Sequence, residues 1–183
     1  MHIGAGSRQD TLETTGAAYL LGKMLSRGTT SHSKASFNEE IESMGARLAL
    51  EIQREQSSIS LRCLKSDVSR AIDLIGDAVS NATLDSAEIE LTKQEVAQEH
   101  DRNHKDYEGM LLEQAHYNAY RDHMMGQPTR GDPDQLQNLN ADVLNEYRAA
   151  NYFGDNIVIV GTGGIGNHDD FVDRVNQAFS SIG

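Results

Sequence analysis

Apolar residues near the N-terminus recur at the three- and four-residue intervals that are typical of helices. The run GAAYLLGKML, which starts at Gly16, has this spacing and predicts a helix. We expect Thr14 or Thr15 to be its N-cap, and Gly28 stands just past its end. A second helix is predicted from about Ser36, where the same spacing returns.

The apolar spacing then changes to the alternation of a strand. Apolar residues alternate with polar ones over 48–52, the polar letters QREQ follow, and the alternation resumes over 59–63. Two alternating segments joined by a short polar turn predict a β-hairpin with one buried face. In this pattern the single cysteine, Cys63, points toward the core as a packing residue.

The second half of the chain is predicted to be mainly helical. An apolar stripe runs over 68–79, a capping pair begins a long helix at Asp85, and Asn140 caps a later helix. The segment 123–140 holds both prolines and marks a surface loop. The continuous apolar run NIVIVG over 156–161 predicts a short strand buried on both faces, before a final amphipathic helix.

Strands therefore fall at the beginning, in the middle and near the end of the chain, since residues 2–7 also have the character of a strand end. Helices cluster between them. This order predicts an α+β fold: a mostly antiparallel β-sheet with α-helices packed on one face. A length of 183 residues suits one domain, so we expect a single domain over 1–183.

Composition restricts the classes of partner. The chain has 28 acidic and 16 basic side chains and a net charge of -12. Such a charge repels nucleic acid and favours basic partners, for example basic peptides. The sequence has no apolar run long enough to cross a bilayer, so no transmembrane segment is predicted.

A glycine-rich run, GTGGIG from Gly161 to Gly166, matches the G-x-G-x-x-G spacing of dinucleotide-binding loops. In that fold the motif opens a βαβ unit, and an acidic residue follows about twenty positions later. The sequence printed after Gly166 is too short to complete such a unit. We therefore interpret the run as a turn between a strand and a helix that is capped at Asn167.

Two further motifs are weak. His100 and His104 lie one helical turn apart in HDRNH, a spacing that can chelate zinc. Asp101 stands where an H-E-x-x-H motif has its glutamate, however, and the neighbouring residues are charged, so we interpret this segment as a solvated helix face. The RGD triplet at 130–132 looks like an integrin-binding signal, and we attribute it to chance.

Several segments in one order carry a resemblance that covers nearly the whole chain. They are GSRQDTLETTGAAYLLGKMLSRGTT, IESMGARL, REQ, SNATLDSAEIE and VIVGTGGI. With them the chain resembles the pitrilysin-type (inverzincin) metallopeptidase family, and in particular the N-terminal domain of mitochondrial processing peptidases and complex III core proteins. The REQ and IESMGA segments are more similar to the beta subunit and core protein 1 than to the alpha subunit.

The resemblance also implies where a zinc site would stand. In active members one helix supplies two histidine ligands and a glutamate base, and a later helix supplies a glutamate ligand. The histidine positions fall on Tyr19 and Lys23, and the base falls on Gly22. Glu99 matches the remaining ligand, while Thr92 replaces an outer-shell glutamate. The resemblance therefore implies a degenerate site with no catalytic residue and no bound metal.

These replacements suggest a different role for the site. The ammonium group of Lys23 repels Zn²⁺, and Gly22 has no side chain that could take a proton from water. Our hypothesis is that Lys23 forms a salt bridge with Glu99 and ties the two helices together. The alternative is that Lys23 reaches solvent and Glu99 is an ordinary surface acid. We expect no cofactor; zinc would be the cofactor if this interpretation were wrong.

The resemblance implies a non-catalytic subunit on the matrix side of the mitochondrial inner membrane. It would be either a core subunit of ubiquinol-cytochrome c reductase (complex III) or a non-catalytic, processing-peptidase-like partner, with a structural or presequence-binding role. Its partners would be subunits of the same family, in a hetero- or homo-oligomer, and basic presequence peptides. Two alternatives stay open: an active zinc metalloendopeptidase that cleaves presequences, and a stand-alone binding module for basic peptides.

The resemblance also bears on domain organisation. The family domain normally has further strands before the GSR segment and is followed by a second, similar domain. The chain is therefore expected to be a fragment or a reduced form of the N-terminal-type domain. Its exposed sheet edge would then need a partner.

Overall fold

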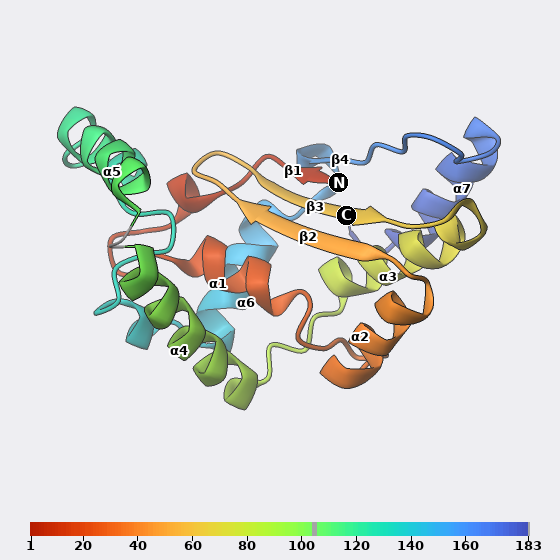
Figure 1. Ribbon diagram of the computed structural model, residues 1–183, viewed down its shortest axis with the longest axis horizontal. Coiled ribbons are helices and arrows are strands. Elements are labelled where there is room, and N and C mark those ends of the chain that lie inside the picture. The colour runs from red at the N-terminus through yellow and green to blue at the C-terminus, as the bar shows by residue number, and fades with distance from the viewer. Residues whose placement is uncertain (104–105, 183) are drawn as a thin grey trace.

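The fold is an antiparallel sheet with helices packed against it. The computed structural model describes residues 1–103 and 106–182 (Figure 1). Every strand pairing in this part of the chain is antiparallel, and the order across the sheet is β2-β3-β1-β4. The strands are β1 (His2–Ile3), β2 (Arg47–Ile52), β3 (Ser57–Arg62) and β4 (Ile157–Val158). The predicted α+β class is confirmed.

Helix α1 (Ala17–Met24) lies at the centre of the molecule, beneath the sheet, with α6 beside it (Figure 1). Its small and apolar residues are buried almost completely, so α1 packs closely on the sheet and on its neighbouring helices. The other helices are α2 (Lys34–Ser43), α3 (Val68–Ser80), α4 (Ser86–Asn103), α5 (Tyr107–Ala119), α6 (Ala141–Asn151) and α7 (His168–Ala178).

The start of α1 differs from the prediction. Its N-cap is Gly16 at φ 89°, so the proposed caps Thr14 and Thr15 are wrong. The carboxylate of Asp10 instead accepts hydrogen bonds from the backbone N–H groups of Gly16 at 2.9 Å and Ala18 at 3.1 Å. A buried acid from an earlier turn therefore satisfies the helix terminus.

Most other local predictions are confirmed. The β2–β3 hairpin has the expected buried face, and Asn140 caps α6 by accepting from Val143 N–H at 3.0 Å. Asp85 accepts from two backbone N–H groups at the start of α4, and Asn167 accepts from one at the start of α7. Helix α2 begins at Lys34, slightly before the predicted start.

The predicted strand over 156–161 needs correction. Only Ile157 and Val158 form β4, which lies at an edge of the sheet. Val158 and Val160 are 59% and 58% exposed, so the run is not buried on both faces. The alternation of half-buried isoleucines with exposed valines is that of a strand covered on one face only.

Two further features differ from simple expectation. Cys63 follows the end of β3 and is partly buried, so it lines a groove rather than the core. The sequence pattern did not predict α5 as a helix distinct from α4. Several apolar side chains of α5 are exposed. Among the described helices, none has the length and apolar character needed to span a membrane.

Candidate functional site

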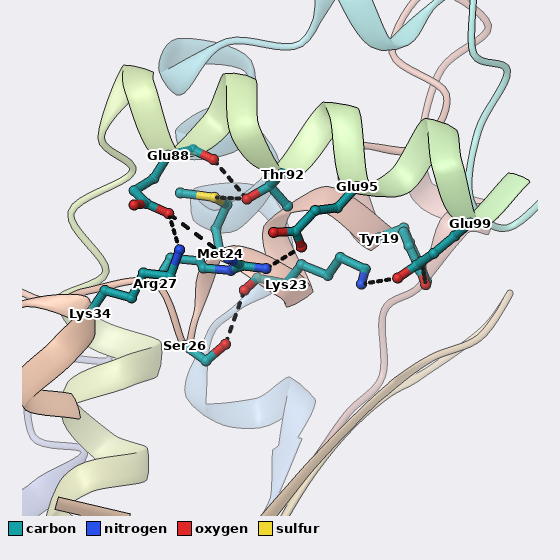
Figure 2. A network of polar contacts seen from close by, with 10 residues as sticks. All are labelled: Tyr19, Lys23, Met24, Ser26, Arg27, Lys34, Glu88, Thr92, Glu95 and Glu99. Atoms are coloured by element: carbon teal, nitrogen blue, oxygen red, sulfur yellow. Dashed lines mark hydrogen bonds and ion pairs between the residues drawn. The ribbon is translucent and has the colours of Figure 1, made fainter. Parts of the chain in front are cut away.

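The candidate site lies where α1 runs beside α4 (Figure 2). Lys23 Nζ on α1 lies 2.7 Å from Glu99 Oε1 on α4. Tyr19, one helical turn before Lys23, donates its hydroxyl proton to Glu99 Oε2 at 2.8 Å. Both carboxylate oxygens of Glu99 therefore have a partner from the same face of α1.

The electrostatics of this cluster favour an ionised carboxylate. Burial raises the pKa of Glu99, but the hydrogen bonds from Lys23 and Tyr19 and the charges of Lys23 and Arg130 outweigh it, and the pKa lies below its usual value. Burial and the contact with Glu99 raise the pKa of Tyr19, which keeps the phenol protonated at neutral pH. The cluster thus contains one ion pair and one neutral hydroxyl donor.

The ring of Tyr19 also contacts two cations. Lys23 Nζ lies 5.4 Å from the ring centroid, and the guanidinium carbon of Arg130 lies 5.6 Å from it. These distances are within the range of cation–π contacts. Tyr19 therefore connects the ion pair on the helices to the loop that carries Arg130.

Gly22 lies on the buried face of α1, between Tyr19 and Lys23 in sequence. A Cβ atom at this position would lie only 2.4 Å from Ile52 Cδ1 on β2. The absence of a side chain allows α1 to approach the sheet closely, and any larger residue would have to displace Ile52.

Further polar contacts continue along the same two helices. Thr92 is buried, donates to the carbonyl of Glu88 at 2.7 Å and lies 3.5 Å from Met24 Sδ. We call the row of ion pairs beside it the α1–α4 charge seam. Its members are Lys23–Glu99, Arg27–Glu95, Arg27–Glu88 and Lys34–Glu88 (Figure 2). The seam joins α1, Arg27 just after its end, and Lys34 at the start of α2 to α4.

A cleft of about 700 Å³ opens beside this cluster. Tyr19 and Arg130 line it together with Arg54, Glu113 and His116, which come from the hairpin turn and α5. Sequence analysis met Arg54 and Arg130 only within the REQ and RGD triplets and assigned neither them nor the α5 residues to a site. These positions stand in polar, aperiodic segments, and only the folded chain shows that they meet.

Comparison with known proteins identifies the family. The model of the family described as Insulinase (Peptidase family M16) matches residues 1–133. The chain belongs to the insulinase family. This agrees with the resemblance found in the sequence.

The relatives and the solved structures point the same way. Mitochondrial-processing peptidase subunit beta of Neurospora crassa is 30% identical over all of this chain, and cytochrome b-c1 complex subunit 1 of Homo sapiens is 27% identical over 98% of it. The chain spans 38% and 37% of these two proteins. A crystal structure of a peptidase M16 inactive domain from Pseudomonas fluorescens superposes with a TM-score of 0.87 at 20% sequence identity. The match includes 99% of this chain and 44% of that one.

The residues of the candidate site do not fit the zinc ion of this metallopeptidase family. Zinc requires neutral histidine, thiolate or carboxylate donors in a tetrahedral arrangement. Here the positions that the resemblance assigns to zinc ligands hold a phenol at Tyr19, an ammonium at Lys23 and a carboxylate at Glu99 whose two oxygens are already hydrogen-bonded. Among the side chains that the structure describes, those of residues 1–100 and 106–182, no three from His, Cys, Asp or Glu form a group that could hold a metal ion.

The other sequence motifs lie elsewhere in the family fold. The glycine run at 161–166 forms a loop between β4 and α7, and the antiparallel pairing of β4 is incompatible with a βαβ nucleotide unit. His100 lies on α4, the side chain of Asp101 is not described, and His104 lies outside the described residues. Gly131 of the RGD triplet is buried against Gly16 at the start of α1.

Proposed function

We propose that this chain is a non-catalytic member of the insulinase family that acts as a subunit of a larger assembly. The observation that carries the proposal is the Lys23–Glu99 ion pair, with the Tyr19 hydrogen bond, at the positions that the resemblance assigns to zinc ligands. Both oxygens of the Glu99 carboxylate accept hydrogen bonds from Tyr19 and Lys23, so a zinc ion could bind Glu99 only by displacing one of these donors. The helix contact is therefore made by side chains alone.

The same residues lack the groups that peptide hydrolysis requires. A zinc peptidase uses the metal to lower the pKa of water and a carboxylate to accept its proton. Gly22 supplies no carboxylate, and Ile52 occupies the space into which a side chain would extend. Lys23 supplies a positive charge where a neutral ligand is needed. We infer a binding or structural role for this face.

The partners that we propose are subunits of the same family. The relatives are named as a subunit of a mitochondrial processing peptidase and a subunit of a cytochrome b-c1 complex, and the chain spans less than two fifths of either protein. We therefore propose a mitochondrial, matrix-side location and an N-terminal-type domain that completes an assembly with a second family domain. The net charge of -12 supports contact with basic presequence peptides.

Zinc content and cleavage test the non-catalytic role. The purified protein is assayed for zinc and for cleavage of a presequence peptide, beside a Tyr19→His/Lys23→His variant. We expect no stoichiometric zinc in the unmodified protein, but about one zinc per chain in the variant, because two histidines then join Glu99. Adding Glu99→Gln to the variant should remove this zinc. Neither protein should cleave, since Gly22 still provides no base.

Stoichiometric zinc with chelator-sensitive cleavage by the unmodified protein would overturn the proposal. It would establish the active metalloendopeptidase instead and turn attention to ligands beyond the family positions. The alternative of a stand-alone module for basic peptides makes a separate prediction. The protein would then be monomeric at all concentrations and would bind such a peptide without any family partner.

A further inference from the structure

The cleft of about 700 Å³ beside the candidate site holds positive charge inside a protein whose net charge is -12. Its volume is typical of ligand sites, and two guanidinium groups line it, those of Arg54 and Arg130. Arg54 comes from the turn between β2 and β3, and Arg130 comes from the loop before α6. In Figure 1 the β2–β3 turn points toward α5, which forms another wall of the same cleft. We call this cavity the arginine cleft.

The fold holds Arg54 in place at the cleft. Its backbone carbonyl accepts from Arg8 N–H at 2.8 Å, and its Nε donates to the carbonyl of Met125 at 3.0 Å. Its Nη2 atom is buried and has no hydrogen-bond partner within the part of the chain that the structure describes. An unpaired buried donor is costly, so an acceptor that engaged this guanidinium from the cleft would relieve the cost.

Arg130 is positioned by the close packing of its loop on α1. Gly131, at φ 79°, is buried, and a Cβ atom at Gly16 would lie only 2.8 Å from the carbonyl oxygen of Arg130. The guanidinium carbon of Arg130 lies 5.6 Å from the ring centroid of Tyr19, which lines the cleft as well. The second cation is therefore also held by the fold and not by a long flexible segment.

The acidic side chains of the lining do not neutralise these cations. Glu55 lines the cleft but is paired with Arg8 at 2.7 Å, so its charge is already balanced. Glu113, on α5, is the other acid of the lining. Neither Glu113 nor Arg54 takes part in an ion pair within the described residues.

The neighbouring cluster adds to the positive charge. Lys23 forms an ion pair with Glu99, and the charge of Arg130 also contributes to lowering the pKa of Glu99. One carboxylate therefore interacts with two cations. At the cleft and beside it, three cations (Lys23, Arg54 and Arg130) stand against two carboxylates (Glu99 and Glu113), which leaves one positive charge without a counter-charge.

We propose that the arginine cleft binds a carboxylate group of a peptide ligand through Arg54 and Arg130. Guanidinium groups bind carboxylates through charge-assisted hydrogen bonds that are often bidentate. Neutral polar side chains of the lining, Gln53, Gln56 and Thr129, offer hydrogen bonds to the rest of the ligand. The inference rests on the binding role proposed above for this face and adds the charge of the ligand. A basic presequence peptide would be repelled from this cleft and would contact the protein elsewhere.

Binding of labelled peptides tests the proposal. The first probe is Ala-Ala-Glu-Ala-Ala with an amidated C-terminus and an uncharged N-terminal fluorophore, titrated with the full protein and followed by fluorescence anisotropy. We expect saturable binding that weakens as salt is added. Replacing the peptide glutamate with glutamine should weaken binding by about tenfold, because the charge-assisted hydrogen bonds are lost. Replacing it with lysine should abolish binding.

A second probe distinguishes the two sources of a carboxylate. It is a pentaalanine peptide with the same fluorophore and a free C-terminus, beside its amidated form. Tight binding of the free form alone would assign the ligand as a chain terminus. Tight binding of the glutamate peptide alone would assign it as an acidic side chain, and either result supports the proposal.

Four variants connect the binding to the cleft. Arg54→Gln and Arg130→Gln should each weaken binding by about tenfold, because each removes one guanidinium. Glu113→Gln should strengthen it by about threefold, since a repelling charge is removed, and a misfolded variant could not show such a gain. Arg62→Gln removes the same charge from an exposed residue outside the lining and should leave binding unchanged. Thermal unfolding checks that all four variants fold.

Three results would overturn the proposal. The first is no saturable binding of either carboxylate peptide. The second is binding of the glutamine or lysine peptide that is as tight as that of the glutamate peptide. The third is an equal loss in Arg62→Gln and Arg54→Gln, which would show that overall charge and not the cleft attracts the peptide. Failure of the non-catalytic role would be seen separately, as stoichiometric zinc and peptide cleavage by the unmodified protein.

Discussion

A double-mutant cycle on Lys23 and Glu99 tests whether their ion pair ties α1 to α4. Lys23→Met and Glu99→Gln each remove one charge while keeping most of the side-chain volume. The two single variants, the double variant and the unmodified protein are unfolded in urea. The coupling free energy is the part of the double change that the two single changes do not explain.

The burial of the pair sets the expected magnitude. The side chains of Lys23 and Glu99 are 21% and 27% exposed, so solvent screens their attraction only in part. Lys23→Met leaves the Glu99 carboxylate with the Tyr19 hydroxyl as its remaining hydrogen-bond donor among the contacts described above. A partly buried charge that loses its partner destabilises a protein by about 1–3 kcal/mol. Because solvent still screens part of the attraction, we expect a coupling free energy in the lower part of that range, about 1–2 kcal/mol.

The chain offers a matched control. Arg8 and Glu55 have the same 2.7 Å separation between nitrogen and oxygen, but their side chains are 50% and 60% exposed. For Arg8→Met and Glu55→Gln we expect a coupling free energy below about 0.5 kcal/mol. If the Lys23–Glu99 coupling is no larger than that of the control, the pair does not tie the helices and the reasoning is refuted.

Acid provides a second test of the same pair. The pKa of Glu99 in the folded protein lies below its usual value of 4.5, so the stability from ionised Glu99 is fully present above 4.5 and is lost as the pH falls through the lower folded pKa. The coupling should therefore be constant from pH 6 to pH 8 and decrease in acid. A coupling that instead disappeared on raising the pH within this range would contradict the assignment.

Two further predictions concern buried positions. Gly22→Ala should destabilise the protein by about 1–3 kcal/mol, since the added Cβ overlaps Ile52 Cδ1. The added Cβ would also lie 2.5 Å from Ile52 Cγ1, so the relieving change is Ile52→Ala, which removes both atoms. The loss in the double variant should be smaller than the sum of the two single losses, and strictly additive losses in urea unfolding would contradict the contact. Burial raises the pKa of Asp10 from 3.8 to about 7, against the backbone hydrogen bonds from Ala18 and Gly16. Stability from the protonated form is therefore lost as the pH rises toward 7, by up to about 4 kcal/mol. Asp10→Asn should flatten this dependence, and a variant with an unchanged slope would show that another group causes it.

Local periodicity was sufficient to predict most of the fold. The hairpin follows from two alternating segments, because alternation places apolar residues on one face of a strand. The cap at Asn140 follows from a side chain that can accept a backbone N–H next to an apolar stripe. Both signals act over a few residues, so a single sequence contains them completely.

The errors arose where distant residues decide the outcome. Asp10 caps α1 from outside the helix, and the two threonines beside the helix were closer candidates in sequence. The run over 156–161 reads as fully buried, but its place at the sheet edge leaves Val158 and Val160 exposed. Periodicity cannot report which strand is at an edge, because edge position depends on the pairing of the whole sheet.

The candidate site was reached in a different way. Its positions on α1 and α4 came from the family resemblance, since Lys23 and Glu99 are far apart in sequence and belong to separate helices. The roles of Arg130 and Ile52 could not be obtained by that route. Arg130 approaches Tyr19 through the fold of the loop, and Ile52 meets Gly22 through the packing of α1 on β2.

On the proposed non-catalytic role, the α1–α4 charge seam would hold the two helices together without a metal ion. A zinc ion bound by both helices would concentrate their connection at one point, whereas here the connection is distributed over Glu88, Glu95 and Glu99 on one face of α4. The more exposed members of the seam contribute little individually, and Arg27 and Glu88 are 4.0 Å apart, so most of the stabilisation is expected from Lys23–Glu99, which combines low exposure with a 2.7 Å contact. We therefore propose two effects of Lys23: it would oppose metal binding at Glu99, and its ion pair would supply the helix contact that a metal supplies in a zinc-binding member.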